Sequence, residues 1–302
     1  MIGAHTNEWK ALELVCGLNQ STVTLLYGRK GTEAGGLVRT YTKDKGALYY
    51  YGAQASGEKQ QQMFAKQVET QCGVTVAEQT YAQALAAIPS GEESFFLVIE
   101  EVHLLLKKEK TFLTCLRNWL EQRDGVVHVL FSSTDVSWGR DEYAEIAKEL
   151  GRYQGGSVKV EPLKFLDLVR LFPSKSIREC IEMYGITGGI PDYLPCWNPK
   201  LSIKENICRH MLSPRGYLYG EAEQFLKSQL RETAVYETIL ATIAEGKQKL
   251  NDIYKETGFS RAKISVYIKN LAAFGVVEKC DSFETGGWDN AQKGVYGISD
   301  TF

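Results

Sequence analysis

The sequence lacks several patterns that mark whole classes of protein. It has no apolar run of about 18 residues, the length that a membrane span requires, and no basic-plus-apolar leader at Met1. Its seven cysteines follow no C-x-x-C or Cys/His ligand spacing, which argues against a disulfide framework and a structural metal site. We therefore expect a cytoplasmic protein with reduced thiols and no membrane partner.

A strong excess of either charge is also missing. The formal net charge is −2, with 44% hydrophobic and 24% charged residues. This balance argues against a uniformly basic nucleic-acid binder but leaves open a local basic face. At 302 residues the chain is long enough for two or three domains.

Short apolar runs alternate with helical patterns in the first half of the chain. The runs are 22–26 (TVTLL), 47–51 (ALYYY), 95–99 (FFLVI) and 126–131 (VVHVLF). The run at 95–99 is continuously apolar, as is typical of a central parallel strand that is covered on both faces. The alternation predicts an α/β fold over residues 1–160, with a parallel sheet flanked by helices.

The second half of the chain has mainly helical sequence patterns. Strand signals become sparse beyond Gly151, so we expect a boundary near residue 160, a helical lid at 161–230 and a winged helix-turn-helix domain at 231–302. In the last domain, 260–274 is the expected third helix. The segments 276–278 and 295–298 are the expected strands of the wing, with 282–290 as its tip.

A glycine-rich turn follows the first predicted strand, in the sequence YGRKGTEAGGL. A P-loop places its phosphate cradle at such a turn, with the pattern G-x-x-x-x-G-K-[ST]. Counted from Gly28, the second glycine falls on Glu33, the lysine on Ala34 and the hydroxyl residue on Gly35. The turn is therefore a relic of a nucleotide site, a modified site that still binds, or an ordinary turn.

Several further motifs occur in a fixed order along the chain. They are YGRKGTEAGGLV at 27–38, VIEEVHLL at 98–105, two serines at 132–133, a GR pair at 151–152, GGIPDYL at 188–194 and RETAVYETILATIAEG at 231–246. With these motifs the chain resembles the archaeal-type ATPase family, a P-loop group related to AAA+ and STAND ATPases. The two motifs of the second half are the longest and most specific.

The resemblance implies roles for individual residues and also shows departures from the family. Family members read YGRRRVGKTTLL and VIDEFPYL in the first two motifs, so the phosphate-contacting lysine stands here as Ala34. Members usually continue into a nuclease-like domain, whereas this chain ends about where that domain should start. ATP and Mg²⁺ are the implied cofactors, with binding weakened or lost.

The candidate site residues fall into four groups. Glu101, as the base that activates water, and Arg152, as an arginine finger, are the catalytic candidates, and Glu100 is the candidate Mg²⁺ ligand. His103 is expected to be structural rather than a base. The nucleotide-binding candidates are Gly28, Arg29, Lys30, Gly31, Thr32, Gly35, Gly36 and Ser132. The DNA-binding candidates are Ser260, Arg261, Lys263 and Lys269.

Each group also has an ordinary structural interpretation. Two glutamates can end a strand where solvent begins, serines after a strand often cap helices, and a lone arginine is often a surface ion pair. A helix-turn-helix can pack against a protein partner rather than duplex DNA. Residues 247–279 carry seven basic and three acidic side chains, a local excess that favours DNA.

The motifs leave three functional interpretations. The first is an ATP-binding-impaired or pseudo-ATPase regulator that associates with DNA through its winged helix. The second is an active Mg-ATP-dependent ATPase whose non-standard loop uses Lys30, Glu100 and Glu101. The third is a protein-interaction module without a ligand.

Overall fold

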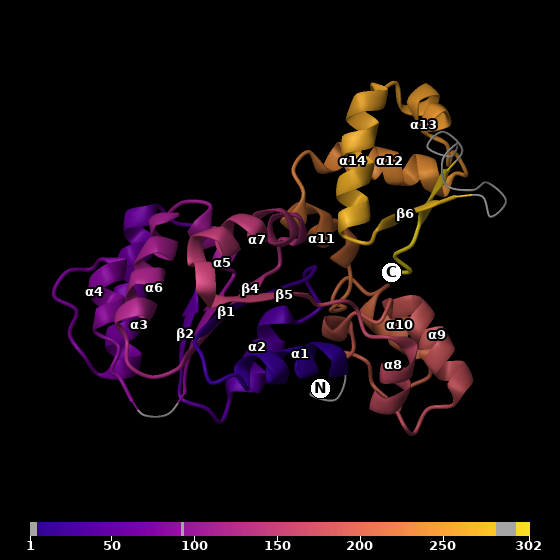
Figure 1. Cartoon of the computed structure of the whole chain (residues 1–302). Helices are drawn as coiled ribbons and strands as arrows, with labels where there is room; N and C mark the ends of the chain where they lie inside the picture. Colours follow the sequence, from indigo (N-terminus) through magenta and orange to yellow (C-terminus); the bar gives the residue numbers. More distant parts are fainter. Residues whose placement is uncertain (1–4, 92–93, 282–293) are drawn as a thin grey trace. The chain divides into compact units, whose positions relative to one another are not determined.

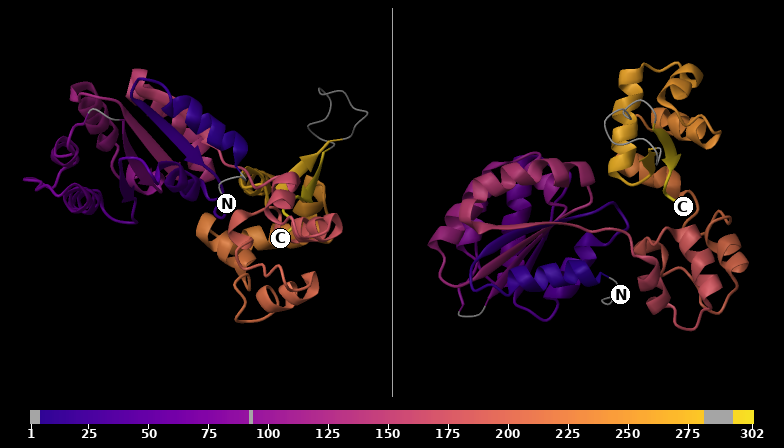
Figure 2. Two further views of the ribbon diagram at one scale, coloured as in Figure 1. Left: turned by 90° about the horizontal axis from the view of Figure 1, so that it is seen from below. Right: turned by 45° about the vertical axis from the view of Figure 1, so that its right-hand side comes forward.

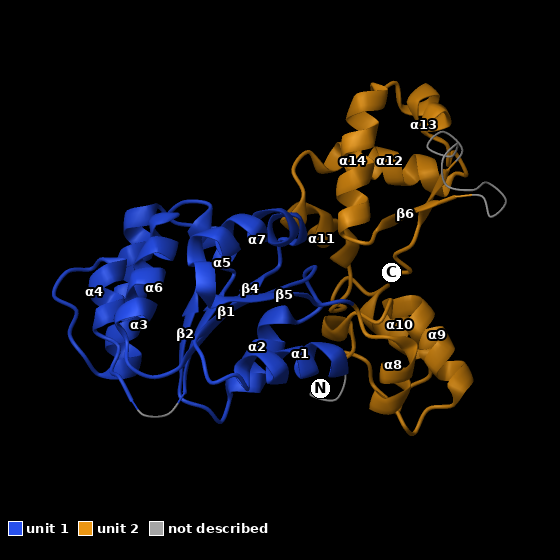
Figure 3. Ribbon diagram, in the orientation of Figure 1, with its two compact units in different colours: residues 1–161 blue, residues 162–302 orange. Residues whose placement is uncertain are grey.

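The computed structural model describes residues 5–91, 94–281 and 294–302. The chain forms two compact units, Met1–Glu161 and Pro162–Phe302 (Figure 3).

The first unit is built on a five-stranded parallel sheet (Figure 1). The strand order is β2-β3-β4-β1-β5. Tyr27 pairs with Ser133 and with Lys159, so the carboxyl ends of β1, β4 and β5 lie at one edge. The strands are β1 (Thr22–Tyr27), β2 (Ala47–Tyr51), β3 (Phe95–Glu100), β4 (Val127–Ser133) and β5 (Gln154–Lys159).

Helices cover both faces of this sheet because successive side chains of a strand point to opposite faces (Figure 2). In β3, Leu97 and Ile99 join one apolar cluster, whereas Phe96 and Val98 join the other. The first cluster includes side chains of α3 (Gly57–Cys72), α4 (Tyr81–Ala86), α5 (Val102–Leu106), α6 (Thr111–Gln122) and α7 (Val136–Leu150). The second includes side chains of α1 (Thr6–Cys16) and α2 (Ala34–Thr42).

The predicted α/β class is confirmed by this sheet, but the sequence prediction omitted one strand. The segment of β5 reads QGGSVK, and its residues are exposed or only partly buried. It pairs with β1 alone, at the end of the sheet order. An edge strand that contributes little to the core leaves no apolar run in the sequence.

The second unit is mainly helical. Its C-terminal part has three helices followed by a two-stranded antiparallel sheet, in the order expected from the sequence. The assignment of this part as a winged helix and the division at residue 230 stay predictions, and the predicted wing tip at 282–290 lies outside the described residues. The elements are α8 (Phe165–Leu171), α9 (Ile177–Thr187), α10 (Ile203–His210), α11 (Glu221–Gln229), α12 (Thr233–Ala244), α13 (Leu250–Thr257), α14 (Arg261–Ala273), β6 (Val277–Cys280) and β7 (Val295–Ile298).

Among the described residues, no helix has the length and apolar character needed to cross a membrane.

One buried histidine makes the stability of the first unit depend on pH. His128 in β4 is fully buried, its Nδ1 lies 2.9 Å from the Thr22 hydroxyl, and its ring lies against Phe96. Its Nε2 is buried and has no hydrogen-bond partner among the described residues. Burial lowers the pKa of His128 below its ordinary value, so the folded state holds the ring neutral.

We predict that this histidine contributes to acid destabilisation. The unfolded ring takes a proton below about pH 6.5, while the folded ring resists protonation, so stability is full above that pH and falls below it. In His128→Gln, the free energy of unfolding should fall less steeply with decreasing pH, by up to about 1 kcal/mol per pH unit. Urea unfolding of both proteins across this range measures the slopes, and parallel pH curves would contradict the prediction.

Candidate nucleotide site

The turn between β1 and α2 is folded tightly at the carboxyl edge of the sheet. Gly31 (φ 94°) and Glu33 (φ 62°) both have left-handed backbone conformations. The hydroxyl of fully buried Thr32 donates a hydrogen bond of 2.8 Å to the Arg29 carbonyl. The Gly28 amide donates to the Ser133 carbonyl at 3.1 Å, which anchors the turn to β4.

Glycine is required at position 28 by the backbone of the segment that follows β5. A Cβ built on Gly28 would lie 2.5 Å from the Val160 carbonyl oxygen, closer than van der Waals contact allows. The Val160 amide in turn donates to the Tyr27 carbonyl at 2.7 Å. The first glycine of the motif therefore lets the chain leave β1 beside the segment that follows β5.

Helix α2 begins directly after this turn and directs its first N–H groups toward the same edge. The N–H groups of a first helical turn have no partner within the helix, and their partial positive charge favours an anion. Glu33 precedes the helix at the second-glycine position of the motif and has a left-handed conformation, which glycine adopts more readily than other residues. The backbone thus has the form of a phosphate cradle, with a carboxylate beside it.

The side chains at the next two positions lack the usual chemistry of a P-loop. Ala34 is only 4% exposed and packs in the apolar cluster with Leu26 and Val38. Gly35 has no hydroxyl group, and a Cβ there would lie 2.7 Å from the Oε2 atom of Glu100. Neither the cation that contacts phosphates nor the hydroxyl that binds Mg²⁺ is present at these positions.

Glu100, at the end of β3, is held by a cation from α2. It is 8% exposed, and the Nε of Arg39 donates a hydrogen bond to its Oε1. This bond raises the pKa of Arg39 above its ordinary value. The Arg39 side chain is 60% exposed, so the rest of its guanidinium reaches solvent at the edge of the sheet.

Glu101 has a different environment from Glu100. Its backbone is left-handed (φ 49°), and its Oε2 accepts hydrogen bonds from the Thr134 hydroxyl at 2.8 Å and the Thr134 amide at 3.2 Å. Burial raises the pKa of Glu101, and the two bonds from Thr134 oppose that rise. The two bonds from Thr134 hold the carboxylate beside the end of β4.

His103 lies beside Glu101 and is buried. Its Nδ1 is 3.2 Å from the Glu101 Oε2 and 3.0 Å from the Ser133 hydroxyl. Burial lowers the pKa of His103 to about 4, so the ring is neutral at pH 7 and the contact with Glu101 is no ion pair.

The structure brings most of the predicted nucleotide-site residues together at this edge. The glycine-rich turn follows β1, Glu100 ends β3 and Glu101 follows it, and Ser132 is buried near the end of β4. The Ser132 hydroxyl would lie 3.5 Å from a Cβ at Gly35. Arg29 in the turn is buried, whereas Lys30 is exposed. Whether these residues bind a nucleotide stays a prediction.

Arg152 is not part of this group within its own chain. It precedes β5, whose first residue Gln154 pairs with Val23 near the amino end of β1. The turn instead follows Tyr27, at the other end of that strand. The guanidinium of Arg152 donates to the Tyr153 hydroxyl at 2.8 Å.

The predicted DNA-binding residues lie at the start of α14 and along it, and three of them already have partners. The Ser260 hydroxyl caps the helix by accepting from the Lys263 amide at 3.2 Å. Arg261 donates to the Asn251 side chain at 2.7 Å, and the Lys263 ammonium lies 3.7 Å from a Glu232 carboxylate oxygen. Lys269 is exposed on the same helix.

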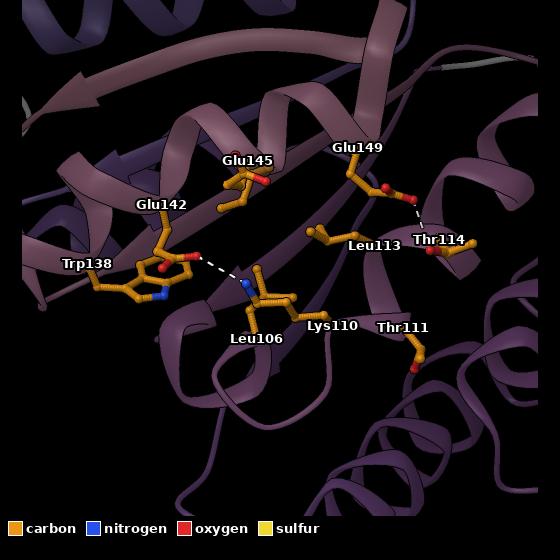
Figure 4. A pocket seen from close by; sticks show the side chains of 10 residues that line it. Leu106, Lys110, Thr111, Leu113, Thr114, Trp138, Glu142, Glu145 and Glu149 are labelled. Carbon is orange, nitrogen blue, oxygen red and sulfur yellow. Dashed lines mark hydrogen bonds and ion pairs between the residues drawn. The ribbon is translucent and has the colours of Figure 1, made fainter.

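A separate cavity of about 300 Å³ lies between α6 and α7 (Figure 4). Lys110 and Glu142 form an ion pair across it at 3.5 Å, and Thr114 donates to Glu149 at 2.9 Å. None of the residues predicted from the sequence to form a site lines this cavity, so the edge with the glycine-rich turn remains the candidate site.

The sequence prediction did not include Arg39 or Thr134, which hold the two glutamates. No motif marks either residue. Arg39 could have been found by asking which cation lies about one turn after Gly35 and can pair with a buried carboxylate. Thr134 directly follows the two serines at the end of β4 and could have been added to that group.

A parallel sheet, a glycine-rich turn before α2 and carboxylates where β3 ends make up the arrangement of a P-loop NTPase fold. No protein-family model matches the chain. It is 23% identical over 297 residues to an uncharacterized protein of Methanocaldococcus jannaschii, covering 98% of this chain. The chain spans 65% of the length of that relative.

Two solved structures share this fold over nearly the whole chain. A Walker-type ATPase of Pyrococcus abyssi matches with a TM-score of 0.66 and 14% identity, covering 99% of this chain and 94% of that chain. The ORC2 protein of Aeropyrum pernix, solved in ADPNP and ADP complexes, matches with a TM-score of 0.61 and 13% identity, covering 98% and 90%. The resemblance to archaeal-type P-loop ATPases is confirmed at the level of the fold.

We predict that Glu33→Gly stabilises the first unit and favours anion binding. Glycine adopts a φ of 62° without the steric cost of about 1 kcal/mol that a residue with a Cβ has there, so the unit should be more stable. The change also removes a negative charge beside the turn, so an anion should bind more readily. Glu33→Ala removes the charge but keeps the steric cost, so it is the matched control. Thermal unfolding with and without inorganic triphosphate measures both effects. Equal stability of the two variants would contradict the backbone argument.

Proposed function

We propose that this chain is an archaeal-type P-loop ATPase-family protein that responds to nucleotide with little or no hydrolysis and associates with DNA through its C-terminal helices. The observation that carries the first part is the buried Ala34, an apolar side chain that stands in place of the phosphate-contacting lysine.

The backbone of the site fits the phosphates of ATP. The left-handed residues Gly31 and Glu33 shape the turn, and the first turn of α2 supplies N–H donors. The ORC2 neighbour, solved with ADPNP and ADP, supports a nucleotide as the ligand of this fold. Losing the lysine removes hydrogen bonds to charged groups worth roughly 1.5–3 kcal/mol each, so we expect weak binding.

Hydrolysis needs charge stabilisation that these residues do not supply. Phosphoryl transfer depends mainly on positioning and on cations that neutralise the developing charge. In this proposal Glu101 would orient a water molecule, but Ala34 and Gly35 provide neither the lysine nor a hydroxyl ligand for Mg²⁺. Binding without turnover is the function that this residue set supports best.

We expect the unmodified protein to bind ATP weakly and to show no turnover above background in a phosphate-release assay. The triple variant Ala34→Lys, Gly35→Thr, Glu100→Asp should bind ATP at least about tenfold more tightly, because it restores the phosphate-contacting lysine. The change Glu100→Asp shortens the carboxylate, which would otherwise be too close to the Cβ of a threonine at position 35. Calorimetry measures the affinities, and Ala34→Met is the control for a long uncharged side chain.

Two outcomes would contradict this proposal. Rapid turnover by the unmodified protein would support the alternative of an active ATPase that uses Lys30. No binding by the unmodified protein or by the repaired variant would support an interaction module without a ligand.

The exposed face of α14 supports DNA as a partner. Arg261, Ser265 and Lys269 follow one another at intervals of four residues and are all exposed, so they share one side of the helix. A helix with basic and small polar side chains on its exposed side suits a major groove. The local excess of basic residues over 247–279 supplies attraction to phosphates.

We predict that Arg261→Glu with Lys269→Glu abolishes a salt-dependent shift of duplex DNA. Each reversal replaces attraction to phosphates by repulsion, so the affinity at low salt should fall by about tenfold or more. The matched control, Arg178→Glu with Lys204→Glu, makes the same charge change on α9 and α10. Equal loss in both variants would point to net charge alone, and an unchanged shift in the test variant would exclude this face.

A further inference from the structure

Glu100 is enclosed by two features of α2, the Arg39 side chain and the backbone at Gly35. On one side, Arg39 donates to its Oε1. On the other side, its Oε2 occupies the space next to Gly35, 2.7 Å from where a Cβ would lie. The carboxylate is 8% exposed, so its charge is balanced mainly by the guanidinium beside it.

Mg²⁺ does not fit this arrangement. In a P-loop the ion takes one ligand from the hydroxyl that follows the lysine and is placed by the acidic residue at the end of the neighbouring strand. Here the first position is Gly35, and the second residue, Glu100, already pairs with a cation. A metal ion at this point would have to displace Arg39, with the like charges of the two cations opposing its entry.

The same guanidinium is placed to contact a phosphate. Side chains of a helix lean toward its N-terminus, which directs Arg39 toward the first turn of α2. Arginine has five N–H donors, and the bond to Glu100 uses Nε, which leaves the two terminal nitrogens for another acceptor. The side chain is 60% exposed, so these nitrogens can meet a ligand that arrives from solvent.

We infer that the site takes nucleotide or inorganic polyphosphate without a divalent cation, with Arg39 supplying the positive charge while it stays paired to Glu100. This inference rests on the proposed nucleotide site, and it names the ionic form of the ligand. Glu100 then orients Arg39 instead of a metal, and Arg39 determines the preference for free over metal-bound phosphate chains.

Calorimetric titration of the full chain with ATP, and separately with inorganic triphosphate, tests this inference in excess EDTA and in excess Mg²⁺. We expect the affinity in EDTA to equal or exceed that in Mg²⁺. Arg39→Gln should lower the affinity in EDTA by about tenfold or more, because it removes the charge and the fork of donors but leaves an amide to bond Glu100.

Two further variants complete the test. Arg39→Lys keeps the charge and should recover part of the affinity. The control Arg117→Ala removes an arginine that pairs with Glu149 at 3.1 Å between α6 and α7, and it should bind like the unmodified protein. Circular dichroism identifies any variant that fails to fold. If Arg39→Gln fails, the affinities of the unmodified protein in EDTA and in Mg²⁺ still test the inference.

The outcomes separate this inference from the proposed function. Binding that requires Mg²⁺, or that is unchanged in Arg39→Gln, would overturn the inference and leave a nucleotide site in place. No binding of either ligand under either condition would overturn the proposed function as well.

Discussion

The ion pair between Arg39 and Glu100 is the interaction on which the candidate site depends. A carboxylate that is 8% exposed needs a compensating charge, because an isolated buried ion is unfavourable by several kcal/mol. The pair provides that charge from α2, directly behind the glycine-rich turn. It also joins the end of β3 to the helix after β1, so it links the two motifs directly.

The layers of the fold explain why these groups meet. The carboxyl ends of parallel strands all lie at the same edge of the sheet, and β4 lies between β1 and β3. The alternation along β3 directs Phe96 and Val98 toward the α2 face, and Glu100 continues that series. Open parallel sheets bind ligands at this edge for the same reason. The sheet therefore determines where the site lies, and a few side chains at its carboxyl edge determine the chemistry of the site.

The sequence predicted the parts of the fold that bury apolar side chains. Phe95 to Ile99 must be covered on both faces, and this requirement produces a recognisable run. β5 could not be predicted because an exposed edge strand needs few apolar residues. In the site, the positions of Ala34, Gly35, Glu100 and Glu101 could be counted from motifs, whereas the pairing of Arg39 could not, since it depends on how α2 lies against β3. The placement of Arg152 at the amino end of β5 depends likewise on strand register.

Two of the turns at the ligand edge have glutamate where the backbone conformation suits glycine. Glu33 and Glu101 both adopt left-handed conformations, with φ values of 62° and 49°. Glutamate and glycine codons differ by a single base, so the second glycine of the motif is one mutation away and that mutation would relieve backbone strain. Alanine and lysine codons differ by at least two bases, and a lysine at position 34 would have to leave an apolar cluster. The conformation of the cradle is thus easily kept or regained in evolution, whereas its cation is not.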